Sequence, residues 1–197
     1  MADSDNGGRT AVFNGIRCQD MIRNLLQIQG YSRNYHAKTL EQLKEARTTL
    51  FPVNGQFAEQ CKVRLLAPYH LGADRRALVD FVMLNRGDDV VLLSIKSQQS
   101  DGTADEKLEF ETQQLIATEQ PAAMLVFGPV RGRDAETGWR LHVLEEIWER
   151  ARHFGSGRVL LFRNTEKLTR WIQHGMPVAG RGTTSAEIFS RYCDRQP

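Results

Sequence analysis

Polar side chains interrupt an apolar stretch near the middle of the chain, Leu92-Leu93-Ser94-Ile95-Lys96-Ser97-Gln98. In a β-strand, side chains two positions apart share a face, so Ser94, Lys96 and Gln98 are expected to project together. A lysine in such a strand needs a carboxylate or a cleft, because desolvating an unpaired ammonium group costs several kcal/mol. Asp80, a lone acid in the preceding apolar run, is the nearest candidate partner. A charged residue in each of two neighbouring apolar strands predicts a functional site in which an acid and a base lie close together.

A β-hairpin is the element that must bring these side chains together. Asp80 lies in Leu78-Val79-Asp80-Phe81-Val82-Met83, and Asn85-Arg86-Gly87-Asp88 separates this run from the next one. That spacer is typical of a turn. If Asp80 and Lys96 pair, the two strands are adjacent and antiparallel.

The arrangement resembles the PD-(D/E)xK nuclease superfamily, whose core hairpin carries a metal-binding aspartate on one strand and an acid-x-lysine triplet on the next. Lys96-Ser97-Gln98, followed by Gly102-Thr103-Ala104-Asp105-Glu106-Lys107, resembles the K-x-Q and G-T/S-x-x-E-K motifs of a group of restriction-type endonucleases. This longer signature is more specific than the triplet. The chain departs from the pattern at Ser94, where the family has an acid.

The resemblance implies magnesium-assisted hydrolysis of DNA phosphodiester bonds, with Mn²⁺ as a substitute ion. By resemblance, Asp80 would be the bridging metal ligand and the backbone carbonyl of Ile95 would complete the inner shell. Lys96 would orient or help deprotonate the attacking water, and its charge would stabilise the transition state. Ser94 and Gln98 complete the predicted catalytic group.

Three glutamates on the following predicted helix are candidates for a relocated acid: Glu106, Glu109 and Glu111. Some restriction enzymes of the superfamily resemble this case, with serine before x-K and a glutamate on the next helix, at an offset that favours Glu109 or Glu111 here. Glu106 is expected to cap the helix by reaching back to Thr103. The alternative is that no acid is relocated and the three form an ordinary solvated helix face.

A second departure lies near the N-terminus, where Gly15-Ile16-Arg17-Cys18-Gln19-Asp20-Met21-Ile22 resembles the family's G-x-x-x-E-x-x-I helix with Gln19 in place of glutamate. We expect a magnesium-dependent endodeoxyribonuclease, acting on DNA as a homodimer so that two sites cut two strands. An alternative is a catalytically degenerate nuclease-fold protein that binds nucleic acid without cleaving it. A third hypothesis, from another class, is a protein-interaction module of the same shape.

The hydrophobic periodicity predicts an α/β fold, and the resemblance makes it a restriction-endonuclease-like mixed β-sheet, an antiparallel meander plus a parallel strand, flanked by helices. We expect helices over 19–29, 39–50, 104–118, 139–154 and 165–173, and strands over 58–66, 77–84, 90–98, 122–128 and 158–163.

Length and composition limit the number of domains and the class of protein. The chain has 197 residues, of which 41% are hydrophobic, and we expect a disordered or poorly ordered tail over residues 1–12 and a single nuclease-like domain over 13–197. No apolar run approaches a membrane span, so a cytoplasmic protein without membrane contact is expected. Three isolated cysteines argue against a disulfide framework or a zinc site. The net charge of +2 permits nucleic-acid binding without requiring it.

Overall fold

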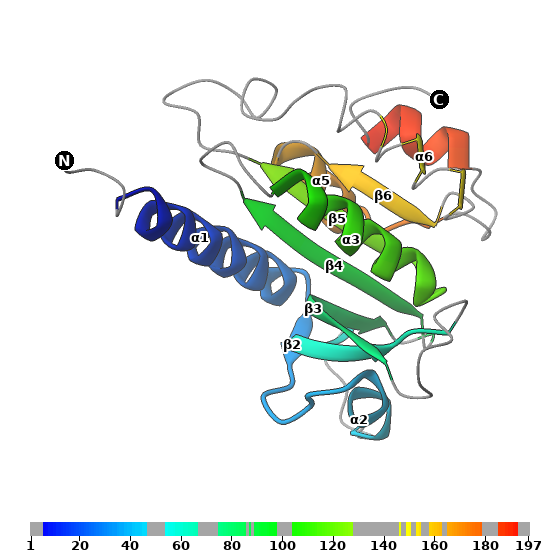
Figure 1. Cartoon of the computed structure of the whole chain (residues 1–197). Coiled ribbons are helices and arrows are strands. Elements are labelled where there is room, and N and C mark those ends of the chain that lie inside the picture. The colour runs from blue at the N-terminus through cyan, green and yellow to red at the C-terminus, as the bar shows by residue number, and fades with distance from the viewer. Residues whose placement is uncertain are drawn as a thin grey trace.

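Helices and strands alternate along the chain in this computed structural model. It describes residues 6–46, 54–66, 75–85, 87, 89–97, 104–127, 146, 149–150, 153–154, 158–162, 165–178 and 185–192. The elements are α1 (Asn6–Ile28), β1 (Tyr31–Arg33), α2 (Leu40–Glu45), β2 (Gly55–Arg64), β3 (Arg76–Asn85), β4 (Val90–Ser97), α3 (Ala104–Ala117), β5 (Ala122–Phe127), β6 (Val159–Phe162), α5 (Thr165–Gln173) and α6 (Ser185–Tyr192) (Figure 1).

The six strands form one mixed sheet whose spatial order follows the sequence, β1-β2-β3-β4-β5-β6. β2, β3 and β4 form an antiparallel meander, while β1 runs parallel to β2, β5 parallel to β4 and β6 parallel to β5. Helix α3 makes the crossover that a parallel β4–β5 pair requires. The predicted α/β class with a meander and a parallel strand is confirmed.

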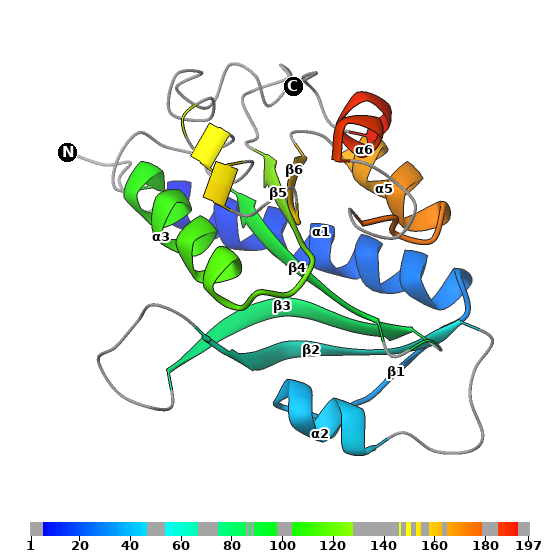
Figure 2. The same ribbon diagram turned by 90° about the vertical axis from the view of Figure 1, so that its right-hand side faces the viewer.

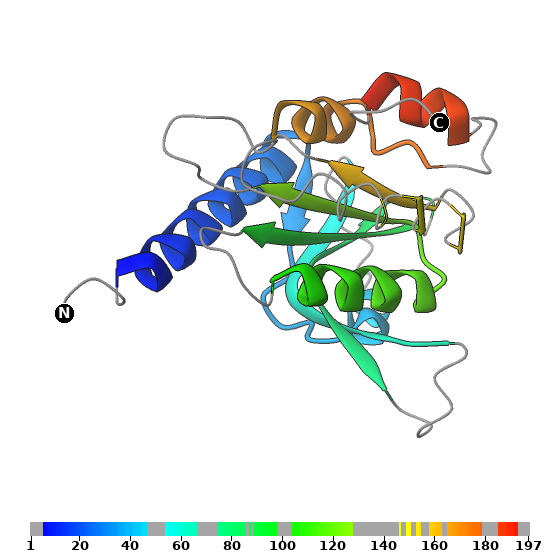
Figure 3. The ribbon, with the colours of Figure 1, turned by 45° about the horizontal axis from the view of Figure 1, so that its top comes forward.

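Helices lie on both faces of the sheet. Figures 2 and 3 show α3 on one side of β4 and α1 on the other, with α5 on the same side as α1. Strand β6 is covered on both faces, because all four of its residues are buried. On α5, the buried side chains Leu168, Trp171 and Ile172 share one face, which explains why this short helix is stable in place. No helix in the described part of the chain has the length and apolar character needed to cross a bilayer.

The turn between β3 and β4 is held by Asn85. Its side-chain oxygen accepts hydrogen bonds from the backbone N–H groups of Gly87 and Asp89, each at 2.9 Å, and its own N–H donates to the carbonyl of Asp89 at 3.0 Å. An asparagine that bonds its own backbone in this way is a common turn former. The predicted hairpin is therefore confirmed.

Strands β3 and β4 separate before either of them ends. Their register runs from Leu84↔Val90 to Phe81↔Leu93 and stops there, although β3 continues to Arg76 along β2 and β4 continues to Ser97 along β5. We call this opening the β3–β4 fork. It places Asp80 and Ser94, the next residues in the register, at the point of separation.

Several boundaries differ from those predicted. Helix α1 begins at Asn6, whereas residues 1–12 were expected to form a tail and the helix was expected to begin at Gln19. Once a helix is nucleated, each added residue contributes a further hydrogen bond, so a helix readily extends beyond the segment that shows a clear apolar periodicity. The short elements β1 and α6 were not predicted, because three or eight residues carry little periodic signal.

Parts of two predicted helices lie outside the described residues. Helix α2 ends at Glu45. Residues 47–53, which include the last part of the predicted 39–50 helix, are not described. Of the predicted 139–154 helix, residues 146, 149, 150, 153 and 154 are described, and all are helical.

Candidate active site

The carboxylate of Asp80 lies in the β3–β4 fork. Its Oδ2 accepts a hydrogen bond from the backbone N–H of Ile95 at 2.7 Å, so a side chain of β3 takes the place of a strand-to-strand backbone bond. In an extended strand the N–H and C=O of one residue point to the same neighbour. The carbonyl of Ile95 is therefore directed toward the fork as well.

Three further neutral groups donate hydrogen bonds to Asp80. Nε2 of Gln19 on α1 and Nε2 of Gln60 on β2 donate to Oδ1 at 3.1 and 2.9 Å, and the hydroxyl of Ser94 donates to Oδ2 at 3.4 Å. Because the single proton of the Ser94 hydroxyl is shared with Glu111, Asp80 has three full donors and one shared donor for the roughly four lone-pair positions of its carboxylate. None of them is charged, and Asp80 forms no ion pair within the part of the chain that the structure describes. Its negative charge is hydrogen-bonded, and no cation among the described residues neutralises it.

Glu111 on α3 brings a second carboxylate to the same point. Its Oε1 accepts a hydrogen bond from the hydroxyl of Ser94 and lies 3.2 Å from Nζ of Lys96. Because the Ser94 hydroxyl lies 3.4 Å from Asp80 and within hydrogen-bonding distance of Glu111, the two carboxylates are at most about 6 Å apart. Ser94 is fully buried and so is fixed between them.

The structure brings together Asp80, Ser94, Lys96, Glu111 and the backbone of Ile95. One detail is corrected: Lys96 was expected to meet Asp80, but its ion pair is with Glu111. Lys96 shares one face of β4 with Ser94, and Ser94 contacts Glu111 of α3, so the lysine lies on the α3 side of the sheet.

The other predicted site residues lie elsewhere or outside the described positions. Glu109 pairs with Arg150, because two residues of helix correspond to about 200 degrees of rotation and so turn it away from Glu111. Helix α3 includes Glu106, but its side chain lies outside the described residues, and so do Thr103 and Gln98.

Gln60 is a site residue that sequence analysis missed. It lies opposite Asp80 in the β2–β3 register, between the pairs Glu59↔Phe81 and Cys61↔Val79, and its φ of 50° interrupts the ladder there. Non-glycine residues in the left-handed region are uncommon and cost of the order of 1 kcal/mol or more, and they cluster at functional sites. An exposed glutamine in a strand carries no sequence signal for this geometry.

Cys18 on α1 borders the site from the other side. Burial, with a smaller contribution from the negative charge of Asp80, raises the pKa of the Cys18 thiol to about 12. The thiol is therefore protonated at neutral pH, which makes it a poor nucleophile.

The oxygen atoms at the fork suit a hard divalent cation. Within the described residues no point gathers three or more histidine, cysteine, aspartate or glutamate side chains. Magnesium does not need such a cluster, since it is usually held by one or two carboxylates together with water and substrate phosphate. Two close carboxylates, one of them without a cationic partner among the described residues, and a backbone carbonyl directed toward them fit that pattern.

Basic side chains extend from the site along the β2–β3 pair. Lys62 and Arg64 are exposed and, at alternate positions, share the face of Gln60, while Arg76 on β3 lies directly opposite Arg64. Arg76 also approaches Glu41 on α2 at 3.3 Å. We call Lys62, Arg64 and Arg76 the basic strip.

No known protein-family model matches the chain. No curated protein and no solved structure is significantly similar to it. The assignment of function therefore depends on the geometry of the site.

Proposed function

We propose that the protein is a magnesium-dependent endonuclease of restriction type that hydrolyses DNA phosphodiester bonds on a restriction-endonuclease-like fold. One observation carries the proposal: Asp80, which has no cationic partner among the described residues, shares the hydroxyl of Ser94 with Glu111, and Glu111 holds Lys96. This is an arrangement of two acids and a lysine around one small volume, with the glutamate supplied by the helix after the strand.

The charge of the site favours a cation. Two carboxylates and one ammonium give it a formal charge of −1, and the Glu111 side chain is only 12% exposed. Asp80, Glu111 and the carbonyl of Ile95 are the groups that would hold magnesium or manganese. Such an ion supplies Lewis-acid stabilisation of the phosphate and lowers the pKa of a bound water.

Ser94 and Lys96 have distinct tasks in this proposal. The hydroxyl of Ser94 has a single proton. Its contact with Asp80, at 3.4 Å, is the longest contact that the Asp80 carboxylate makes. This contact is therefore the one that is lost at the lowest cost when a cation binds to Asp80. Lys96, held 3.2 Å from Glu111 and 30% exposed, is free to contact solvent and phosphate oxygens. There it would orient the attacking water and stabilise the developing negative charge.

The basic strip supports a nucleic-acid partner. Lys62 and Arg64 are exposed cations on β2, and Arg76, which also approaches Glu41, lies opposite Arg64 on β3. Exposed Lys and Arg side chains are the usual contacts to phosphate groups, and the strip begins beside Gln60, which contacts Asp80. Cleavage of both strands would be achieved by a homodimer that presents two such sites.

A second candidate function is binding of nucleic acid without cleavage. It is favoured by the amides of Gln19 and Gln60, which both occupy Oδ1 of Asp80, and by the hydroxyl of Ser94 in place of an acid. In that case, Gln19→Glu combined with Ser94→Glu would create metal-dependent cleavage in an inactive parent. An already active parent would exclude this candidate.

Cleavage of supercoiled plasmid in Mg²⁺ or Mn²⁺ tests the primary proposal. We expect nicked and linear products from the wild type and a loss of at least about a hundredfold in rate for Asp80→Asn, which keeps the shape of the side chain but removes its charge. If the wild type nicks no DNA with either ion and Asp80→Asn behaves in the same way, the enzyme proposal is wrong.

DNA binding is measured separately, in EDTA, by retention at several salt concentrations. Replacing both Lys62 and Arg64 by glutamine should weaken retention and reduce the slope of log affinity against log salt by about two, one for each lost phosphate contact. Lys167→Gln with Arg170→Gln, on α5 across the sheet, makes the same charge change and should leave the slope unaltered. Absence of salt-dependent retention in the wild type would favour the protein-interaction module.

A further inference from the structure

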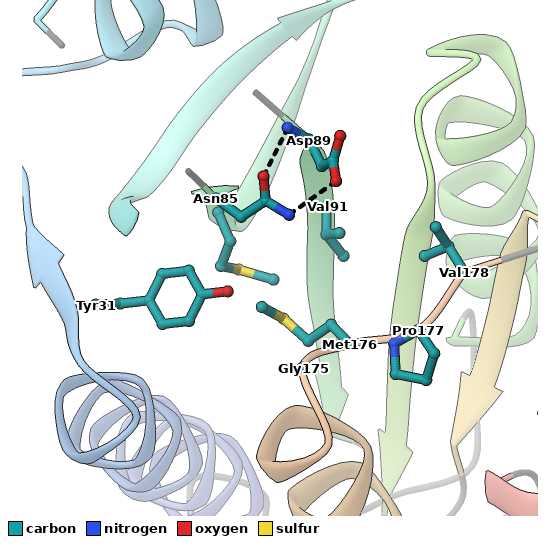
Figure 4. Close-up of a pocket in the computed structure, with 9 residues that line it drawn as sticks. Tyr31, Asn85, Asp89, Val91, Gly175, Met176, Pro177 and Val178 are labelled. Atoms are coloured by element: carbon teal, nitrogen blue, oxygen red, sulfur yellow. Dashed lines mark hydrogen bonds between the residues drawn. The ribbon is translucent and has the colours of Figure 1, made fainter. Parts of the chain in front are cut away.

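A cavity of about 140 Å³ lies beside the β3–β4 turn, bordered by β1 and by the segment that follows α5 (Figure 4). Most of its wall is apolar and consists of Met83, Val91, Met176, Pro177 and Val178. Met83 and Val91 are a register pair, and strand alternation directs their side chains to the face opposite that of Asp80 and Ser94. The cavity is therefore separate from the candidate active site.

The hydroxyl of Tyr31 is an unsatisfied group inside this cavity. Tyr31 is only 7% exposed, and Figure 4 shows its hydroxyl pointing from β1 across the cavity toward Met176. Within the described parts of the chain, this hydroxyl has no hydrogen-bond partner. Burial raises the pKa of Tyr31, so the group remains a protonated donor. A buried hydroxyl without a partner is unusual and points to a missing acceptor.

The remaining polar side chains of the lining are already engaged. Asn85 accepts from the backbone of Gly87 and Asp89, and its Nδ2 donates to Oδ2 of Asp89 at 2.9 Å. Tyr31 is thus the one uncommitted polar side chain among the described lining residues. Its hydroxyl is therefore the side-chain group that remains available to a polar atom of a ligand in this cavity.

The wall formed by Gly175 and Met176 is fixed by hydrogen bonds and does not collapse easily into the space. The N–H of Gly175 donates to the carbonyl of Ile172, and that of Met176 to the carbonyl of Trp171, both at 3.0 Å. Nε1 of Trp171 donates to the carbonyl of Pro177 at 2.9 Å. These bonds hold Met176 at a φ of 55°, with its side chain against the cavity.

We propose that this cavity binds a small, largely apolar ring compound with one hydrogen-bonding group, which pairs with the hydroxyl of Tyr31. The volume sets the size of the ligand, because a cavity of about 150 Å³ with an apolar lining accommodates benzene. The thioethers of Met83 and Met176 are polarisable groups that make favourable contacts with an aromatic ring. Phenol has the size and the polar group required.

Titration with phenol and with toluene, observed through ¹³C-labelled methionine methyl groups, tests the proposal. The two molecules have nearly the same shape, with a hydroxyl in phenol at the position of the methyl group in toluene. We expect both to shift the methyl signals of Met83 and Met176 and to leave those of the other three methionines unchanged. Phenol should bind about three to ten times more tightly than toluene, the contribution of roughly one hydrogen bond.

Tyr31→Phe removes the hydroxyl without changing the shape of the cavity and should abolish the preference for phenol while keeping toluene binding. Tyr35→Phe is the matched control, because Tyr35 is 63% exposed and does not line the cavity, so the preference should persist. If neither molecule shifts the two methyl signals, the cavity is not a ligand site. If phenol keeps its advantage in Tyr31→Phe, Tyr31 is not the recognising group and the proposal fails.

Discussion

Replacement of Glu111 by glutamine is the sharpest test of the site, because it asks whether the relocated acid binds the cation. The change keeps the size of the side chain and its ability to accept from Ser94, but removes the charge that Lys96 contacts. It raises the formal charge of the Asp80, Glu111 and Lys96 group from −1 to zero. The half-saturating concentration of Mg²⁺ should therefore rise.

The size of the effect follows from Coulomb's law. A unit charge about 4 Å from a divalent cation contributes about 2 kcal/mol at the dielectric constant of water and about 8 kcal/mol at an effective value of 20. The Glu111 side chain is 12% exposed and that of Lys96 30%, so the site is neither dry nor fully solvated. Allowing for the desolvation cost of Glu111, we expect a net loss of about 3 kcal/mol, which corresponds to roughly a hundredfold weaker Mg²⁺ binding.

The assay is the initial rate of plasmid nicking as a function of Mg²⁺ concentration. Glu109→Gln is the matched control on the same helix, because Glu109 is 46% exposed and pairs with Arg150 instead. A surface pair of this kind contributes about 0–1 kcal/mol, so the control should change the Mg²⁺ requirement little. Equal shifts for the two variants, or a wild-type Mg²⁺ curve for Glu111→Gln, would refute the assignment of Glu111.

Two further predictions concern pKa and stability. Burial raises the pKa of Cys18 and Cys61 to about 12 from an ordinary value near 9. In a Cys193→Ser background, neither thiol should therefore react with a disulfide reagent at pH 8 until urea unfolds the protein. The free energy of unfolding should fall between pH 9 and 12, because only the unfolded chain loses these protons in that range. Glu59→Gln should lower the free energy of unfolding by about 1–3 kcal/mol in urea titrations, because Glu59 accepts two bonds from Arg23, at 2.7 and 2.8 Å, and joins α1 to β2.

The stability prediction has a matched control, and each of the two predictions has an outcome that would contradict it. Glu166→Gln removes an exposed pair with Arg170 and should cost less than about 0.5 kcal/mol. A stability loss for Glu59→Gln no larger than this would show that the contact with Arg23 does not anchor α1. Fast modification of Cys18 or Cys61 in the folded protein would contradict the burial of those thiols.

The hairpin and its acid were predictable because their signals are local. Two neighbouring apolar runs, with Asn85 in the connection, identify β3 and β4, and register then brings Asp80 close to Ser94. Helix α3 and the buried strand β5 were likewise found from periodicity and apolar runs, with bounds within about one residue of those predicted. These features depend only on the order of side chains along each element.

The partner of Lys96 could not be predicted, because it depends on how one element lies against another. Glu109 and Glu111 occupy the same helix with similar spacing from Lys96, and only the rotation of α3 about its axis directs one to Ser94 and the other to Arg150. The left-handed turn of the backbone at Gln60 is similarly invisible in sequence, since its cost is offset by a contact with Asp80 on the neighbouring strand.

By itself, the sequence determined the five longer strands, the crossover helix and the set of acids and amides available to the site. Tertiary structure decided which of them meet: the fork between β3 and β4 admits the Asp80 carboxylate, and α3 lies so that Glu111 contacts both Ser94 and Lys96. The physical reason is that periodicity specifies which face of an element is buried, whereas the packing of whole elements specifies the rotation and separation that set distances between side chains.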